Sequence, residues 1–431
     1  MDGRTVIRNG VVPPAGHGAT VVVEGNRIAE VAPPGRPVDP RPGDWEIDAD
    51  GRLVVAGLVN AHTNLSLGGI MRYAGLPGRP PPTVADLRAG FRRRIEGRAT
   101  AELIEPLARA GALASLKAGV TCAFDLVRGA PGDAAAALEA VARGADATGL
   151  RAVVAVGARG PAARAEIAEN AAVAAARAAD RRVRAWIGLF GLADVPDDAL
   201  EALAGPARAH GLHACVGEDE GDLAHAFGRF GRRPIELLAA SGLLGPRTLV
   251  AHAGTSVHGE GVALAGAGAS LAVSPRAAMF WGAPLPPLLS FAELGVPVVF
   301  GTCGLFADVA AEAFAGALLH RHQERNAGAA GALVSRVAWP AAARLASAAF
   351  GAPLGALEAG ALADVVVLDW RPAVPVPALP DGDLVFLWAG ASAAWVIVDG
   401  VVRIREGRLL GGDEGEIAAL AREAAERLLA R

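Results

Sequence analysis

The chain has 431 residues, of which 52% are apolar and 20% charged. This composition is typical of a globular protein with room for one large and one small domain, and it excludes a disordered chain. The net charge of -4 gives no electrostatic reason to expect nucleic acid or an anionic membrane as a partner. No charge-free apolar run reaches about 18 residues, the length of a membrane span. The N-terminus leads into a strand pattern rather than a signal peptide, and three cysteines are too few for a disulfide framework. We therefore expect a cytoplasmic protein.

The two ends of the chain share a β-rich pattern. Within the first fifty residues, Gly25-Asn26 separates two runs of alternating apolar residues, which predicts a hairpin. Similar runs return at residues 363–368 and 394–402. These patterns predict a small composite β-sandwich domain made from residues 1–55 and 357–412, with a Pro-rich loop from Arg371 to Pro380. Residues 413–431 have helical apolar spacing and predict a C-terminal helix.

Between the two ends, apolar strand patterns alternate with Ala-rich stretches that predict helices, for example Ala101–Lys117 and Ala162–Ala179. Eight strands that alternate with helices predict a parallel (β/α)8 TIM-like barrel over residues 56–356. An open doubly wound sheet is the alternative, but no Gly-x-Gly-x-x-Gly follows a strand and opens a helix. The predicted strands are Leu53–Val59, Val120–Leu126, Ala152–Val156, Ala185–Leu189, His213–Gly217, Thr248–Ala253, Ser270–Val273 and Val296–Gly301.

Barrel enzymes carry their working groups at the carboxyl ends of the strands. Reading those ends in chain order gives the candidate site residues His62, Asn64, Cys215, Glu218, His252 and Cys303. A long Gly- and Pro-rich connection after the first strand holds Met71 and Tyr73, which could line a substrate pocket or simply pack. Arg276, after the seventh strand, could meet an anionic group of the substrate.

Seven motifs at these positions resemble the amidohydrolase superfamily, in particular its deaminase and chlorohydrolase branch. They cover almost the whole chain in the expected order. In this chain they are GLVNAHTN, GVTCAFD, GLHACVGED, TLVAHAG, SLAVSPRAA, VVFGTCG and LEAGALADVVVLD. The resemblance implies a barrel with an attached β-sandwich built from both chain ends, which agrees with the patterns above.

The resemblance also implies roles for single residues. The family's metal ligands fall on His62, Asn64, Cys215 and Cys303, and only His62 keeps the usual identity. The acid/base glutamate falls on Glu218, and the histidine that polarises the substrate falls on His252. The proton-transfer half of the site is therefore expected to be intact, while the metal half is changed.

The changed positions leave the cofactor open. Asparagine is a poor zinc ligand, whereas a cysteine thiolate is a good one, so His62, Cys215 and Cys303 could hold one zinc or iron ion with Asn64 nearby. Equally, buried cysteines often act as small apolar residues, and then no metal would be bound. A register slip of the fifth strand would make His213 the ligand, but it would displace Glu218. The binuclear branches need a lysine on the fourth strand, and residues 186–189 contain none.

Three functions compete on these grounds. The first is an amidohydrolase-like enzyme that hydrolyses a C–N or C–halogen bond of a small heterocyclic or amide substrate. The second is a metal-independent enzyme for cyclisation, elimination, isomerisation or acyl transfer, with Glu218 and His252 as acid and base and a cysteine as nucleophile. The third is a non-catalytic pseudoenzyme that binds a ligand. In each case the expected partner is a small molecule, and the family resemblance suggests a homodimer.

Overall fold

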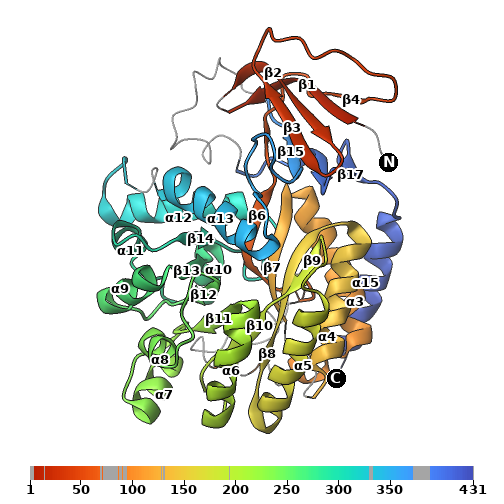
Figure 1. The fold of residues 1–431 in the computed structure, drawn as a ribbon. Coiled ribbons are helices and arrows are strands. Elements are labelled where there is room, and N and C mark those ends of the chain that lie inside the picture. Colours follow the sequence, from red (N-terminus) through yellow and green to blue (C-terminus); the bar gives the residue numbers. More distant parts are fainter. Residues whose placement is uncertain are drawn as a thin grey trace.

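The computed structural model describes residues 4–13, 15–67, 70, 86, 90, 95–127, 129, 132–193, 195–329, 333–371 and 389–430. Figure 1 shows a barrel of strands surrounded by helices, with sheets from the two chain ends stacked above one end of it. The predicted fold class, a TIM-like barrel with a small β domain from both ends, is confirmed. Among the described residues, no helix is both long and apolar enough to cross a membrane.

Two sheets form the β domain. The first has the strand order β3-β2-β1-β4, and the second has the order β18-β17-β16-β15-β5. Glu24 pairs with Arg27, so the predicted hairpin is confirmed. The strands are β1 (Arg4–Val12), β2 (Gly16–Glu24), β3 (Arg27–Ala32), β4 (Trp45–Asp48), β5 (Val54–Ala56), β15 (Val365–Leu368), β16 (Ala393–Val398), β17 (Val401–Arg405) and β18 (Arg408–Leu409).

One apolar core joins these two sheets. It contains Ile7 and Val21 from the N-terminal sheet and Val365 and Ile397 from the C-terminal sheet. The alternation of apolar residues along each strand places one side-chain face in this core. The shared core supports the predicted composite domain, whose boundaries at residues 55 and 357 stay a prediction. Most of the predicted loop from Arg371 to Pro380 lies outside the described residues.

The predicted strand Leu53–Val59 is in fact two strands. β5 belongs to the C-terminal sheet, and β6 (Leu58–Thr63) is the first barrel strand. Gly57 separates them, and a Cβ atom at this position would lie 2.0 Å from Thr121 Oγ1. Only glycine allows the chain to pass so close to the barrel as it changes sheets. An apolar run gives no sign of such a change, because both halves are buried.

Eight parallel strands form the barrel in chain order. The predicted fourth strand, Ala185–Leu189, is interrupted at Trp186, and its first part is the short strand β9 (Val183–Ala185), which pairs with β8. The other barrel strands are β7 (Val120–Val127), β8 (Arg151–Ala158), β10 (Ile187–Phe190), β11 (Leu212–Val216), β12 (Thr248–His252), β13 (Ser270–Val273) and β14 (Val298–Phe300).

The last strand meets the first through the segment after β14. The backbone N–H groups of Thr302 and Cys303 both donate to the carbonyl of His62, at 2.8 and 2.9 Å. The amide of Asn60 completes the seam by donating to Thr302 Oγ1 at 2.9 Å. A Cβ atom on Gly301 would lie 2.6 Å from the Cβ of His62, so this approach also requires glycine. The seam thus fixes His62 beside the eighth strand.

Helices cover the outside of the barrel. The prediction of Ala101–Lys117 as a helix matches α3 residue for residue, while the helix predicted at Ala162–Ala179 is shorter. The helices are α3 (Ala101–Lys117), α4 (Ala134–Thr148), α5 (Ala163–Ala176), α6 (Asp197–His210), α7 (Glu220–Phe230), α8 (Pro234–Ala240), α9 (His258–Ala267), α10 (Pro275–Trp281), α11 (Leu288–Glu293), α12 (Val309–Glu324), α13 (Trp339–Phe350) and α15 (Glu414–Leu429).

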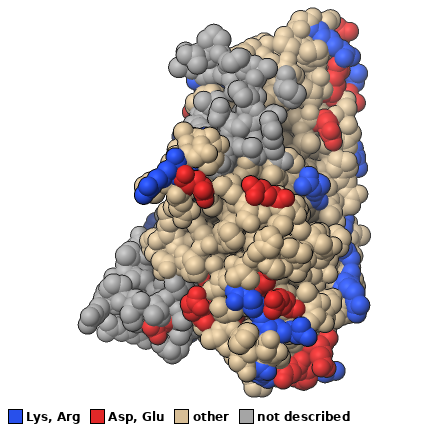
Figure 2. All heavy atoms as spheres, turned by 90° about the vertical axis from the view of Figure 1, so that its left-hand side faces the viewer, with Lys and Arg blue, Asp and Glu red and all other residues tan. Residues whose placement is uncertain are grey.

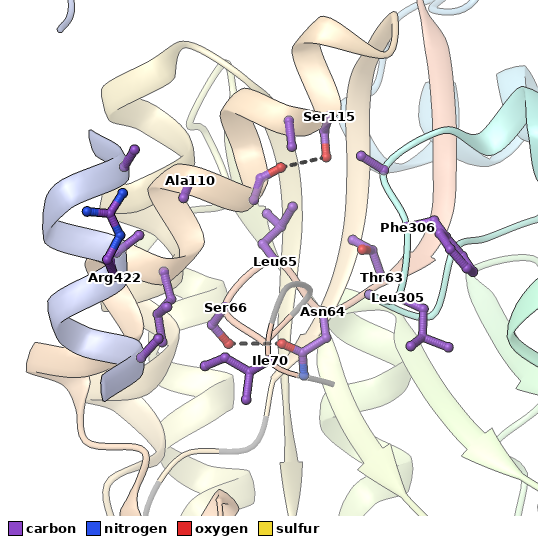
Figure 3. Close-up of a pocket in the computed structure, with 18 of the residues that line it drawn as sticks. Thr63, Asn64, Leu65, Ser66, Ile70, Ala110, Ser115, Leu305, Phe306 and Arg422 are labelled. Atoms are coloured by element: carbon purple, nitrogen blue, oxygen red, sulfur yellow. Dashed lines mark hydrogen bonds between the residues drawn. The ribbon is translucent and has the colours of Figure 1, made fainter. Parts of the chain in front are cut away.

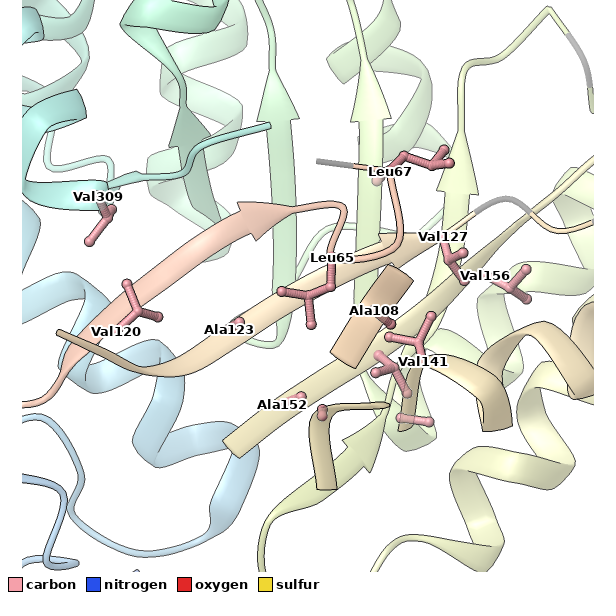
Figure 4. Close-up of a cluster of buried hydrophobic side chains, with 14 of the residues drawn as sticks. Leu65, Leu67, Ala108, Val120, Ala123, Val127, Val141, Ala152, Val156 and Val309 are labelled. Atoms are coloured by element: carbon pink, nitrogen blue, oxygen red, sulfur yellow. The ribbon is translucent and has the colours of Figure 1, made fainter. Parts of the chain in front are cut away.

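The barrel strands separate two apolar cores. On β7, Ala123 and Val127 point outward to α3 and α4, where they join Ala108 and Val141 (Figure 4). Phe124, on the opposite face of the same strand, points into the barrel interior. The same alternation places Cys215 of β11 on the inner face. Side chains near the carboxyl ends of the strands can therefore converge inside the barrel.

Candidate active site

Three of the predicted site residues converge at the carboxyl ends of β6, β11 and β12. One nitrogen of His62, the sulfur of Cys215 and one nitrogen of His252 all lie within 4.8 Å of one another. His62 Nε2 is 3.7 Å from Cys215 Sγ, and the rings of His62 and His252 are 5.0 Å apart, edge to face. Imidazole nitrogen and thiolate sulfur are the donors that zinc prefers, so this donor set fits a zinc ion.

Cys303 contacts His252 but is not one of the three residues of this group. Its sulfur is 3.9 Å from His252 Nε2, and its side chain packs with Ala277 and Leu305. Both Cys303 and His252 have positive φ angles, 51° and 73°, in the left-handed region that non-glycine residues seldom adopt. Such backbone conformations cluster at functional sites because the surrounding structure must enforce them. The structure thus brings Cys303 close to the group through its contact with His252.

The side chain of Asn64 is engaged in the turn that follows β6. Its Oδ1 accepts hydrogen bonds from Ser66 Oγ at 2.9 Å and from the backbone N–H of Leu67 at 3.1 Å (Figure 3). Its Nδ2 donates to the carbonyl of Leu126 at 3.3 Å. An amide held in this way shapes the turn, which gives Asn64 a structural role at a position where the family resemblance implies a metal ligand.

Glu218 lies in a tightly fixed loop between β11 and α7. It is buried, with 7% of its surface exposed. Asp222 accepts hydrogen bonds from the backbone N–H groups of Gly217 and Leu192, and Asp219 accepts one from the N–H of Asp222. These bonds hold the backbone on both sides of Glu218. The sequence analysis missed Asp222, whose only signal was its place in the first turn of a helix that follows a barrel strand.

The buried histidines of the site are neutral. Burial, followed by the charges of His252 and His213, holds the pKa of His62 well below its usual value. Burial also lowers the pKa of His213 to about 3. Nearby, burial raises the pKa of Asp125 to about 7, although the N–H of Leu65 donates to its carboxylate. Neutral imidazole is the form that keeps a lone pair for a metal ion.

His213 lies directly behind His62. Its Nε2 is 2.9 Å from His62 Nδ1, and both side chains are buried. Sequence reasoning considered His213 only as a replacement ligand after a register slip. The structure keeps the register with Cys215 in the group and gives His213 a different contact. Its signal in the sequence was its position two residues before Cys215, which places both on one face of β11.

Arg276 is the second residue of α10 and is held from two sides. Its guanidinium carbon lies 3.7 Å from the centre of the Phe306 ring. Its backbone N–H donates to Glu312 Oε2 at 2.8 Å, and its Nε lies 3.8 Å from Glu312 Oε1. Burial raises the pKa of Glu312 to about 8. The other two candidates for substrate contact, Met71 and Tyr73, lie outside the described residues.

A cavity of 680 Å³ lies beside the turn that follows β6. Thr63 and Asn64 line one side of it, and Arg422 of α15 lines the opposite side (Figure 3). Its walls are otherwise mostly apolar, from α3, α15 and the segment after β14. His62, Cys215 and His252 are not among its described lining residues, so this cavity is separate from the three-residue group.

Comparison with known proteins places this chain in a family. The model of the amidohydrolase family matches residues 53–403. A 5-methylthioadenosine/S-adenosylhomocysteine deaminase of Halobacterium salinarum is 31% identical over 408 residues, which are 90% of each chain. A 5'-deoxyadenosine deaminase of Methanothermobacter thermautotrophicus is 27% identical over 425 residues, 95% of this chain and 94% of the relative.

Solved structures share the fold over almost the whole chain. An adenosine deaminase from Xanthomonas campestris with bound zinc has a TM-score of 0.82 at 20% identity and covers 98% of both chains. An atrazine chlorohydrolase from Arthrobacter aurescens in complex with zinc has a TM-score of 0.79 at 22% identity, covering 98% of this chain and all of its own. The prediction of an amidohydrolase-like hydrolase for carbon–nitrogen bonds is confirmed at the level of the family. The family match and the first relative together show that the chain belongs to the amidohydrolase family.

Proposed function

We propose that this protein is a zinc-dependent deaminase that removes an exocyclic amino group from a small heterocycle of the modified-adenosine type. The observation that carries the proposal is the convergence of His62, Cys215 and His252 at the carboxyl ends of three barrel strands. These three residues would hold the ion, and zinc bound there supplies a Lewis acid that makes a water molecule more acidic. The substrate class is supported by the deaminases of adenosine derivatives that share 27–31% identity over most of the chain.

Glu218 supplies the proton transfer. A carboxylate close to a water molecule can take its proton and pass it to the leaving nitrogen, so that water adds to the ring carbon and ammonia leaves. The loop hydrogen bonds of Asp219 and Asp222 hold the backbone around this residue in place. His252 has a ligand position in this proposal, whereas the sequence analysis gave it the role of polarising the substrate. Cys303, beside His252, then acts on that imidazole and not on the ion.

The test is a metal and turnover measurement on the purified chain. The protein is stripped with a chelator, supplied with zinc, and assayed for ammonia release from adenosine, 5'-deoxyadenosine and 5-methylthioadenosine and for chloride release from a chloro-s-triazine. We expect about one equivalent of bound zinc and release of ammonia from at least one adenosine derivative. Less than about one-tenth equivalent after supplementation would contradict a metal enzyme. Bound zinc without turnover on any of these compounds would favour a ligand-binding protein.

A second candidate is a metal-independent enzyme, favoured by the two thiol–imidazole contacts. Cys215 and Cys303 lie 3.7 and 3.9 Å from the Nε2 atoms of His62 and His252. An imidazole at such a distance can activate a thiol as a nucleophile. Activity that survives chelation but is lost in Cys303→Ser would support this candidate over the zinc enzyme.

The predicted homodimer is supported by an exposed apolar surface. Met279 and Phe280 of α10 and Leu318 of α12, a helix that packs against α10, are 44–51% exposed. Figure 2 shows a broad area with few charged side chains on the side of the molecule where α9, α11 and α12 lie. Light scattering coupled to gel filtration tests the dimer. The cytoplasmic location stays a prediction.

A further inference from the structure

We propose that His213 is a positioning residue: it holds the His62 imidazole with its proton on Nδ1, so that the lone pair of Nε2 faces Cys215 and His252. This inference deepens the proposed function and rests on it, because that lone pair is what a metal ion at the site would bind. A ligating histidine commonly donates its second ring N–H to a fixed acceptor, which sets both its tautomer and its orientation. Here the acceptor is another imidazole.

The contact between the two rings is short and buried. His213 Nε2 lies 2.9 Å from His62 Nδ1, and the ring planes meet at 78° with their centres 5.1 Å apart. The side chain of His213 is fully buried and that of His62 is 4% exposed. Water therefore cannot replace this hydrogen bond. His213 and Cys215 lie on one face of the same strand, so β11 carries both the residue that contacts His62 Nδ1 and the residue that contacts His62 Nε2.

The direction of the hydrogen bond follows from what the proposed metal site requires of His62. A contact between two neutral imidazole nitrogens contains one proton, which belongs to either His62 or His213. A metal ion at Nε2 of His62 needs the lone pair of that atom, so the proton of a neutral His62 ring is on Nδ1, the atom that faces His213 Nε2. The second nitrogen of His213, Nδ1, is buried and has no hydrogen-bond partner among the described residues.

The rest of the chain of protons is then fixed. With His62 Nδ1–H as the donor, His213 Nε2 must accept with its lone pair, so the proton of a neutral His213 ring is on Nδ1. His62 Nε2 is left without a proton, and this atom lies 3.7 Å from Cys215 Sγ. In the opposite arrangement His213 Nε2–H would donate to His62 Nδ1, and the proton of His62 would be on Nε2, where it would prevent that atom from binding a metal ion. The low pKa values of both rings agree with neutral forms.

Two substitutions of His213 separate positioning from packing. His213→Leu removes the acceptor and leaves His62 Nδ1–H buried without a partner, so that ring is free to change tautomer or turn. His213→Gln keeps an amide oxygen that can accept the same hydrogen bond. The matched control is His17→Gln, an exposed histidine of β2, far from the barrel strand ends.

The first measurement is Co²⁺ binding, which is monitored by the charge-transfer absorption of the Cys215 thiolate. We expect His213→Leu to bind Co²⁺ about 10- to 100-fold more weakly than the wild type, with His213→Gln near the wild type and His17→Gln unchanged. Wild-type affinity in His213→Leu would overturn the inference. If the wild type itself binds no cobalt, the proposed function fails instead.

The second measurement reads the tautomer directly and needs no metal. Long-range proton–nitrogen NMR spectra of the ¹⁵N-histidine-labelled, metal-free wild type distinguish the two neutral tautomers of each ring. We expect the proton of His62 on Nδ1, assigned by the signal that is lost in His62→Gln. A proton on Nε2 would overturn the inference, even if every His213 variant failed to fold.

Discussion

His62 Nε2 and Cys215 Sγ lie 3.7 Å apart although 153 residues separate them in the sequence. Their contact exists because β6 and β11 lie on opposite sides of a closed barrel whose interior side chains meet. No local feature of the sequence brings these two residues together. Cys215, at a position where the family resemblance implies a histidine ligand, thus supplies a zinc-compatible donor inside the barrel.

Substitution of Cys215 is expected to abolish metal binding. Without the sulfur, only two of the three donors are left, and zinc should fall from about one equivalent to below about one-tenth in Cys215→Ala, measured by atomic absorption. The control is Cys122→Ala. Cys122 is equally buried, in β7, and burial raises the pKa of its thiol. It has no role in the proposed metal site. Full zinc content in Cys215→Ala would show that this sulfur is not a ligand.

Glu218→Gln is expected to slow turnover without affecting metal content. The amide cannot accept the proton of a water, and loss of a general base lowers kcat about 10²- to 10⁴-fold. The value of kcat is measured as the rate of ammonia release at saturating substrate, and the zinc content is determined on the same sample. Asp198→Asn, an exposed carboxylate at the start of α6, is the control. A Glu218→Gln variant with wild-type kcat would assign the proton transfer elsewhere.

Glu312 should make the protein less stable as the pH rises. Burial raises its pKa in the folded state to about 8, against 4.5 for an ordinary glutamate; Arg276 lowers and Asp308 raises that value to lesser extents. Between these two values the folded protein binds a proton that the unfolded chain does not, so the free energy of unfolding falls as pH increases through this window.

Glu312→Gln removes that dependence. The difference between its urea midpoint and that of the wild type should grow from about pH 5 to about pH 8.5. Over this range only the wild type loses stability, because it must ionise a buried carboxyl. Glu358→Gln, at an exposed position, should show no such difference. An equal pH dependence in wild type and Glu312→Gln would mean that Glu312 is ionised at neutral pH.

The buried ion pair between the barrel and the β domain should be important for stability. Arg151 of β8 contacts Asp364, just before β15, through Nη2–Oδ1 at 3.0 Å and Nε–Oδ2 at 3.2 Å, and neither side chain is exposed. Arg151→Met leaves a buried carboxylate without its partner, which typically costs about 3–5 kcal/mol.

The same substitution at an exposed pair is the control. Arg371 and Asp50 form an ion pair whose side chains are 49% and 68% exposed, and Arg371→Met should cost at most about 1 kcal/mol. Urea unfolding of both variants gives the comparison. Equal losses in the two variants would mean that the pair at Arg151 is not what joins the two parts of the chain.

The sequence by itself determined the alternation of strands and helices, and with it the barrel. Apolar periodicity is a local property, so α3 and the hairpin at Glu24 and Arg27 were predictable from their own residues. Strand ends were predictable too, and they placed His62, Cys215, Glu218 and His252 at one rim. The family motifs gave these positions their chemistry.

Only the tertiary structure decided which of these side chains meet. The break at Gly57, the joining of His252 and not Cys303 to His62 and Cys215, and the contact of His213 with His62 all depend on residues distant in the sequence. Asn64 turns into its own loop because the backbone of Leu67 and the carbonyl of Leu126 take its amide. Periodicity fixes the face on which a side chain lies, but its neighbours across a closed barrel are fixed by how the strands pack.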